Sequence, residues 1–112
     1  MSEPRLDESV LMSLKEVMED EYPLLLETFL CDSQERIRLL QQAIANDDAP
    51  AVRNAAHSFK GSCSNMGAAL LAGFCKQLEE AGRTAQLAQA PALLSAIEAE
   101  FAAVRELMLA PH

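Results

Sequence analysis

Residues 52–66 of the chain read VRNAAHSFKGSCSNM. When this stretch is plotted on a helix at ~100° per residue, its apolar side chains share one side. They are Val52, Ala55, Ala56, Phe59, Cys63 and Met66. His57 points to the opposite side, among small or basic residues: Arg53, Lys60, Gly61, Ser64 and Ala68. The stretch therefore predicts an amphipathic helix that shows water an imidazole beside two cations, which is a place for a small anion.

Two further helices are predicted before this stretch. A short one follows Pro4, with Asp7 or Ser9 as its N-cap and an apolar line of Val10, Leu14 and Val17. A long helix opens at Tyr22-Pro23, because proline is tolerated in the first turn. Its apolar stripe is Leu26, Phe29, Leu30, Ser33, Ile37, Leu40 and Ile44. A turn at 46–50 then leads into the central helix, which is capped by Asp48 or Ala49.

Two more helices are predicted after the central one, which runs from Pro50 to about Met66. A break at Gly67 separates it from a fourth helix, which reaches about Ala81 and has Gly82 as its C-cap. The fifth begins near Pro91 and has the clearest apolar spacing: Leu94, Ile97, Phe101, Val104 and Met108. Four substantial helices with short connections, together with the short N-terminal helix, predict an all-α antiparallel four-helix bundle.

Composition and charge narrow the class of protein. The chain has 112 residues, half of them hydrophobic, which predicts one packed domain. The net charge of −8 argues against nucleic-acid binding, yet residues 49–78 contain no Asp or Glu and three cations. No apolar stretch approaches the ~20 residues of a membrane span, and the charged N-terminus does not resemble a signal peptide. We expect a cytoplasmic protein without a membrane segment.

The three cysteines also indicate a cytoplasmic protein. Cys31, Cys63 and Cys75 have no CxxC spacing and lie among apolar neighbours, which favours reduced core thiols. The two histidines, His57 and His112, supply no zinc-ligand spacing. We therefore expect the chain to bind no metal or cofactor.

Phosphoryl transfer is the chemistry that fits the surroundings of His57. Lys60 and Gly61 follow it by three and four residues, so both are its neighbours on the helix surface. Either His57 or Lys60 could instead be an ordinary solvated side chain. Gly61 is less easily explained in that way, because glycine inside a helix costs ~1 kcal/mol of stability relative to alanine. Since Gly61 lies on the outer face, a role in the close approach of a partner is favoured over packing within the bundle. The chain has no Gly-rich nucleotide loop, so a partner protein would supply the phosphoryl group.

The motif His57-Ser58-Phe59-Lys60-Gly61-Ser62, followed by Gly67-Ala68, resembles the signature of histidine-containing phosphotransfer (HPt) domains. The resemblance extends over about residues 8–108. It implies that His57 accepts a phosphoryl group from a receiver-domain aspartate of a hybrid sensor kinase. It also implies that His57 passes the group to a receiver aspartate of a response regulator. The chain would then be a phosphocarrier in a phosphorelay, with no autokinase activity.

The resemblance also implies roles for the residues around His57. The phosphorylated atom would be Nε2, Lys60 would neutralise phosphoryl charge, and Gly61 would clear space for docking. Glu79, 22 residues after the histidine, would hydrogen-bond the imidazole better than Gln77. Ser64 matches a small polar family position. The expected docking surface comprises Arg53, Gly61, Ser64 and Ala68, the divalent metal belongs to the partner receiver, and the chain is expected to be a monomer.

Other functions fit the sequence less well. A dimeric histidine-kinase bundle usually has an acid directly after the histidine, where this chain has Ser58. A di-metal bundle needs Glu-x-x-His pairs, but Asn54 stands three residues before His57. Serine hydrolysis lacks a nucleophile elbow. The alternative that stays open is an adaptor, a helical bundle that docks receiver domains without carrying phosphate.

Overall fold

Capping residues and prolines set most of the helix boundaries in the computed structural model, which describes residues 5–110. The Asp7 side chain accepts a hydrogen bond from Ser9 N and caps α1 (Glu8–Met18). A 3-10 helix, η1 (Glu19–Glu21), leads into α2 (Tyr22–Ala45). The Asp48 side chain accepts from Ala51 N and caps α3 (Ala49–Asn65). The last two helices are α4 (Ala69–Arg83) and α5 (Ala90–Leu109).

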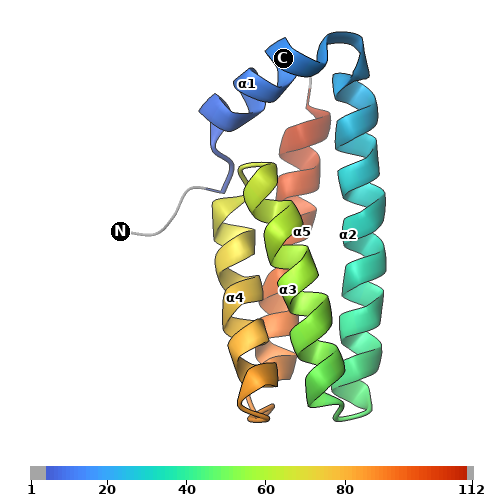
Figure 1. The fold of residues 1–112 in the computed structure, drawn as a ribbon, viewed down its shortest axis with the longest axis vertical. Coiled ribbons are helices and arrows are strands. Elements are labelled where there is room, and N and C mark those ends of the chain that lie inside the picture. The colour runs from blue at the N-terminus through green and yellow to red at the C-terminus, as the bar shows by residue number, and fades with distance from the viewer. Residues whose placement is uncertain (1–4, 111–112) are drawn as a thin grey trace.

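The all-helical prediction is confirmed, because residues 5–110 contain helices and turns but no strand. Figure 1 shows α2, α3, α4 and α5 side by side, with the chain reversing direction at each connection. Helix α1 lies across one end of this group, the end where α5 finishes. The predicted break at Gly67 is present, since this residue has φ +74° between α3 and α4, a conformation that glycine adopts readily.

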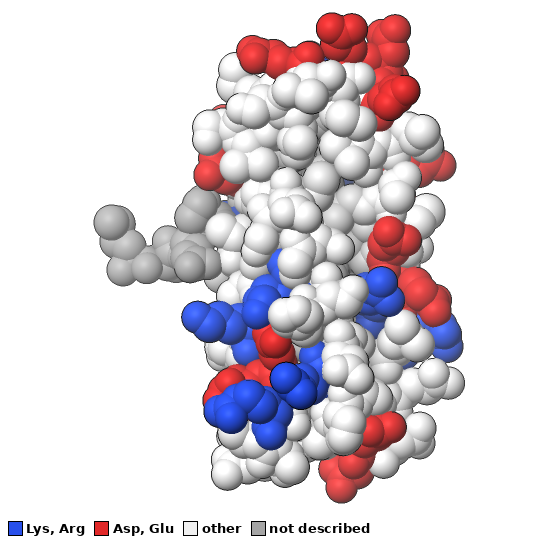
Figure 2. Space-filling model, viewed as in Figure 1, with Lys and Arg blue, Asp and Glu red and all other residues white. Residues whose placement is uncertain are grey.

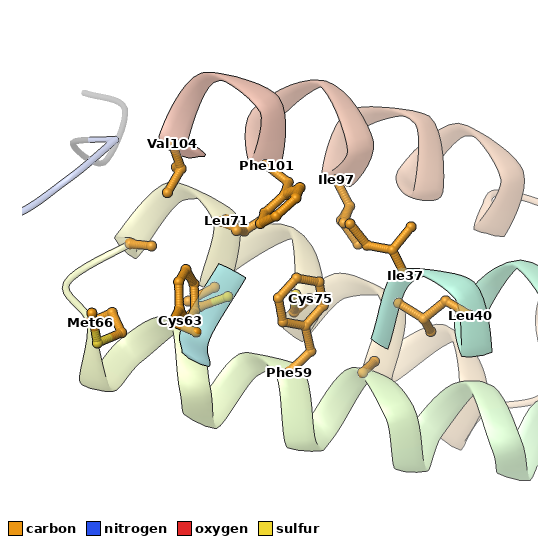
Figure 3. Packing of buried hydrophobic residues seen from close by; sticks show 14 of the residues in the cluster. Ile37, Leu40, Phe59, Cys63, Met66, Leu71, Cys75, Ile97, Phe101 and Val104 are labelled. Atoms are coloured by element: carbon orange, nitrogen blue, oxygen red, sulfur yellow. The ribbon is translucent and has the colours of Figure 1, made fainter. Parts of the chain in front are cut away.

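The core lies between the four long helices, where their apolar stripes meet (Figure 3). The predicted stripe of α3 is confirmed at Val52, Ala56, Phe59, Cys63 and Met66, all of which are buried. The largest side chains without exposed surface are Phe59, Leu40, Leu71, Leu78 and Ile97. Because this stripe faces the core, the opposite face of α3, with His57, is left to solvent.

Three sequence predictions about burial and helix ends are wrong. Cys31 is exposed on α2, whereas Cys63 and Cys75 are buried as expected. The hydrogen bond with Cys75, together with burial, raises the pKa of the Cys63 thiol above its ordinary value, so that thiol stays protonated. Val17 on α1 is 79% exposed, because α1 spans the end of the bundle and packs on it with a different side. Gly82 is not a C-cap, since α4 continues to Arg83.

Gly82 instead allows a close approach of α3 and α4. A Cβ atom at this position would lie 2.6 Å from Arg53 N and 2.9 Å from Ala49 O, both backbone atoms of α3. Backbone atoms of a packed helix cannot turn aside as a side chain can. The buried glycine therefore holds the end of α4 against the start of α3, the helix that carries His57.

We expect Gly82→Ala to destabilise the protein by about 1–3 kcal/mol, the usual cost of overpacking. The matched control is Gly61→Ala, where an added Cβ meets nothing within 4 Å and helix propensity alone predicts a gain of about 1 kcal/mol. Urea unfolding followed by circular dichroism measures both free energies of unfolding. Equal shifts for the two variants, or a gain in stability for Gly82→Ala, would contradict the tight contact at Gly82.

Candidate functional site

His57 lies in the middle of α3 on the face turned away from the core. Its side chain is 68% exposed, whereas Ala56 and Phe59 on the other side of the helix are fully buried. The packing of these neighbours fixes the helix, so the backbone that carries the imidazole is held firmly while the ring stands in solvent.

The neighbouring helix α4 orients the imidazole ring. Its Glu79 Oε2 lies 2.7 Å from Nδ1 of His57. Leu78 and Cys75 are buried on the core side of α4, which leaves Glu79 at the edge facing α3, with its side chain only 17% exposed. A side chain that is largely shielded on one helix thus holds the exposed ring on the other in one orientation.

Glu79 also binds Lys60, one turn after His57 on α3. Lys60 Nζ donates to Glu79 Oε1 at 2.5 Å. The hydrogen bond from Lys60, with a smaller contribution from His57, holds the pKa of the Glu79 carboxyl below its ordinary value. Glu79 is therefore ionised at neutral pH.

The ionised carboxylate determines which nitrogen of His57 is free. A carboxylate can only accept hydrogen bonds, so Nδ1 of His57 must carry the proton that Glu79 Oε2 accepts. In the neutral ring Nε2 then has an unshared electron pair. Because Nδ1 is the nitrogen occupied by Glu79, Nε2 is the atom available for attack on an electrophile.

Basic residues dominate the surface around this site. Figure 2 shows Lys and Arg gathered over the lower half of the face formed by α3 and α4, with the acidic side chains mainly at the ends and along one edge. Arg53 is exposed one turn before His57, and Lys76 is exposed one turn before Glu79. Although the whole chain is acidic, the exposed cations Arg53 and Lys76 lie where they would attract an anion that approaches His57.

Comparison with known proteins is consistent with this geometry. The sequence profile of the Hpt domain matches residues 24–107, most of the chain. The chain belongs to the Hpt domain family. Among solved structures it is similar to the crystal structure of histidine-containing phosphotransfer protein B (HptB) from Pseudomonas aeruginosa PAO1. The two chains are 60% identical, the match covers 96% of this chain and 93% of that one, and the TM-score is 0.92. No curated protein matches the chain in sequence.

Membership of the Hpt family establishes the general function. The chain is a histidine phosphotransfer protein of a two-component phosphorelay, as predicted from the motif around His57. Hpt proteins work with receiver domains of kinases and response regulators, and they are phosphoryl carriers rather than kinases.

The structure brings together most of the residues that the sequence singled out. His57, Lys60 and Glu79 form one connected group, and Gln77 is exposed outside it. Gly61 and Ser64 are exposed on α3. Nothing fills the space in front of Gly61, where an added Cβ would meet no atom within 4 Å.

Ala68 is a correction. The sequence placed it on the exposed face of α3 with Gly61 and Ser64, but it is fully buried. The helical projection assumed an unbroken helix, whereas α3 ends at Asn65 and Gly67 redirects the chain before Ala68. Ala68 is the N-cap of α4 and belongs to the core, so it is no part of a docking surface.

Sequence reasoning missed one feature of this Hpt site, the ion pair between Lys60 and Glu79. The sequence assigned Lys60 to phosphate and Glu79 to the imidazole, without a contact between them. Because both residues were expected near His57, their opposite charges were the available signal.

The described residues show neither a metal site nor a membrane segment. In the part of the chain from 5 to 110, no group of three or more His, Cys, Asp or Glu side chains could hold a metal ion. Within the same range, no helix is both long and apolar enough to cross a bilayer. His112 lies outside the described residues.

Proposed function

We propose that His57 is the phosphoryl-carrying residue and that its Nε2 is the atom modified. The observation that carries this proposal is the 2.7 Å contact between Glu79 Oε2 and Nδ1 on a side chain that is 68% exposed. One nitrogen is occupied by an ionised carboxylate and the other is left for chemistry. A histidine with a purely structural role would have no need of this arrangement on the outer face of α3.

The proposed reaction moves a phosphoryl group between two aspartates through His57. Nε2 attacks the phosphorus of an aspartyl phosphate on a receiver domain, the P–O bond breaks, and the aspartate leaves as a carboxylate. In the second step an aspartate of another receiver attacks phosphorus, and the P–N bond breaks with its electron pair returning to Nε2. We propose hybrid sensor kinases and response regulators as the sources of these receivers, with the divalent metal held by the receiver and none by this chain.

Lys60 supplies positive charge to the phosphoryl group in this proposal. Its side chain is 30% exposed and is paired with Glu79, so the flexible ammonium group is already held within one helical turn of His57. When a dianionic phosphoryl group arrives on Nε2, Lys60 can turn from the carboxylate to the phosphoryl oxygens. Its positive charge then offsets the new negative charge.

The scaffold assigned to this function is an antiparallel four-helix bundle, α2 to α5, with the short helix α1 added at one end. We infer that the chain, residues 1–112, is a single domain with its core at about residues 8–108, and that it acts as a monomer in the cytoplasm. Arg53, Gly61 and Ser64 are the proposed docking residues that remain after the correction at Ala68. An adaptor without phosphate chemistry is disfavoured, because docking alone does not require the linked group His57, Glu79 and Lys60.

Transfer between two receivers tests the function. A purified receiver domain carrying a ³²P-labelled aspartyl phosphate is mixed with the protein and then with a second, unlabelled receiver. We expect acid-labile label to appear first on the protein and afterwards on the second receiver. Label that stays on the first receiver, with every candidate receiver from the same organism, would refute the carrier function.

We expect Gly61→Gln to slow receiver-to-His57 transfer by about 10-fold or more. A long side chain at this exposed position would hold the receiver away from Nε2, and small displacements of reacting atoms cost large factors in rate. Stability should not fall, since glutamine is a better helix former than glycine and the site is open. Gly61→Ala is the matched control with a much smaller effect. A normal transfer rate in Gly61→Gln would contradict the role of Gly61 in docking.

A further inference from the structure

The two oxygens of Glu79 have separate partners. Oε2 binds Nδ1 of His57 at 2.7 Å and Oε1 binds Nζ of Lys60 at 2.5 Å. If Lys60 turns to a phosphoryl group on Nε2, the carboxylate loses one of its two cationic partners. The Nδ1–H group of His57 is then the partner that remains, and it lies on the shielded side of the ring.

The proton on Nδ1 decides how readily a phosphoryl group leaves Nε2. With that proton in place, the P–N bond breaks, its electron pair returns to Nε2, and the leaving group is a neutral imidazole. Without that proton the leaving group is an imidazolate anion, which is far more basic and leaves much more slowly. A hydrogen bond from the charged form of a group to an acceptor favours that charged form, so a carboxylate beside Nδ1 favours the protonated, phosphorylated ring.

We propose that Glu79 holds the proton on Nδ1 of phosphorylated His57 and thereby sets the rate at which the phosphoryl group leaves. This inference rests on the proposed function, since it requires a phosphoryl group on Nε2. Glu79 acts here as a positioning residue, through His57. An amide in its place would accept the same hydrogen bond without the negative charge, so charge is the property that the proposal assigns.

Other charged groups near Glu79 are accounted for. From α3, the charged or titratable groups are Lys60 and His57, which bind it, and Arg53, which is exposed one turn before His57. On α4 itself, Lys76 is exposed, and Glu80 is paired with Arg83. Among residues 5–110, α2 and α5 make no hydrogen bond or ion pair with Glu79. Glu80 therefore offers a matched control, a neighbouring carboxylate without contact to His57.

The experiment measures the lifetime of the phosphorylated protein against pH. The full chain is phosphorylated with phosphoramidate, the donor is removed, and decay of the phosphohistidine is followed by ³¹P NMR from pH 5 to pH 9. In hydrolysis, water attacks phosphorus, the P–N bond breaks and phosphate leaves. We compare the wild type with Glu79→Gln, Glu79→Asp and Glu80→Gln, and circular dichroism checks the fold of each.

We expect the decay rate of Glu79→Gln to fall at lower pH than that of the wild type. At a pH where the wild-type ring keeps its Nδ1 proton and the variant ring does not, the phosphorylated variant should live about 10-fold longer, a difference of about 1.4 kcal/mol in the barrier. Glu79→Asp, which keeps the charge, should lie between the two, and Glu80→Gln should match the wild type. Decay is first order, so incomplete phosphorylation of a variant does not affect the comparison.

An unchanged or shortened lifetime in Glu79→Gln would overturn the inference while leaving the carrier function intact. The same holds if Glu80→Gln reproduces the effect, because general surface charge would then be the cause. If Glu79→Gln fails to fold, the comparison of Glu79→Asp with the wild type decides by the same criterion. If the wild type itself acquires no phosphohistidine from phosphoramidate or from a phosphorylated receiver, the proposed function falls and this inference falls with it.

Discussion

Replacing His57 with glutamine is expected to abolish phosphoryl uptake completely. Glutamine keeps a polar side chain of similar reach, but its amide nitrogen has no free electron pair with which to attack phosphorus. Glu79 and Lys60 stay in place, so charge attraction for the phosphoryl group persists without the nucleophile. The measurement is acid-labile ³²P on the protein after incubation with a phosphorylated receiver domain.

Two controls separate this loss from damage to the fold or from other histidines. His57 is 68% exposed, and surface substitutions usually change stability by less than about 0.5 kcal/mol, so His57→Gln should unfold at the wild-type urea concentration. The chain has one other histidine, His112, and His112→Gln should take up label normally. Acid-labile label on His57→Gln would show that another residue carries the phosphoryl group.

Phe59→Ala should cost about 3–5 kcal/mol of folding free energy, the range for deleting a buried aromatic ring. Phe59 has no exposed surface and is the largest side chain in the core that is fully enclosed. Figure 3 shows it pointing from α3 into the space between the helices. Since domains are stable by only about 5–15 kcal/mol, this loss removes much of the total, and it loosens the helix that presents His57.

Urea unfolding measures this effect, and two variants calibrate it. Phe59→Leu keeps an apolar side chain in the same space and should lose clearly less than Phe59→Ala. Phe74→Ala on α4 removes the same ring from a half-buried position and should also cost less. A loss below about 1 kcal/mol for Phe59→Ala would mean that this part of the core collapses around the cavity or that the ring is not enclosed.

The helices were predictable because their signals are local. Asp7 and Asp48 cap helices by accepting hydrogen bonds from the first turn. Gly67, with its positive φ, separates α3 from α4 where the sequence predicted a helix break. The spacing of apolar residues and the capping of helix ends depend on residues within a few positions of one another, so both can be predicted from the sequence alone. The buried stripe of α3, with Phe59 and Cys63, followed for the same reason.

The errors arose where contacts between helices decide the outcome. The preference of glycine for helix C-caps assigned Gly82 to a helix end, but the backbone of α3 lies where its Cβ would be. Cys31 has apolar neighbours in sequence yet faces solvent, because no other helix covers that side of α2. Ala68 was projected from a helix that had already ended. Each of these errors depends on which part of the chain lies beside the residue in space, and a projection of one helix does not show its neighbours.

The residues of the site were predicted, but the ion pair that links Lys60 to Glu79 was not. The motif identified His57 and Lys60, and the resemblance to Hpt domains implied a contact between Glu79 and the imidazole. The carboxylate that joins Lys60 to His57 required the registry of α3 against α4. That registry also depends on the close approach at Gly82, one turn after Glu79 on α4. A residue that makes no contact with His57 therefore helps to set the geometry of the site.

In the proposed function, Nε2 of His57 carries the phosphoryl group while Nδ1 keeps its proton against Glu79. The most direct test is ³¹P and ¹H–¹⁵N NMR on protein labelled with ¹⁵N-histidine and phosphorylated with phosphoramidate. We predict a phosphorus–nitrogen coupling to Nε2 of His57 and a bonded proton on its Nδ1. Phosphorus on Nδ1, or on any residue other than His57, would contradict the account.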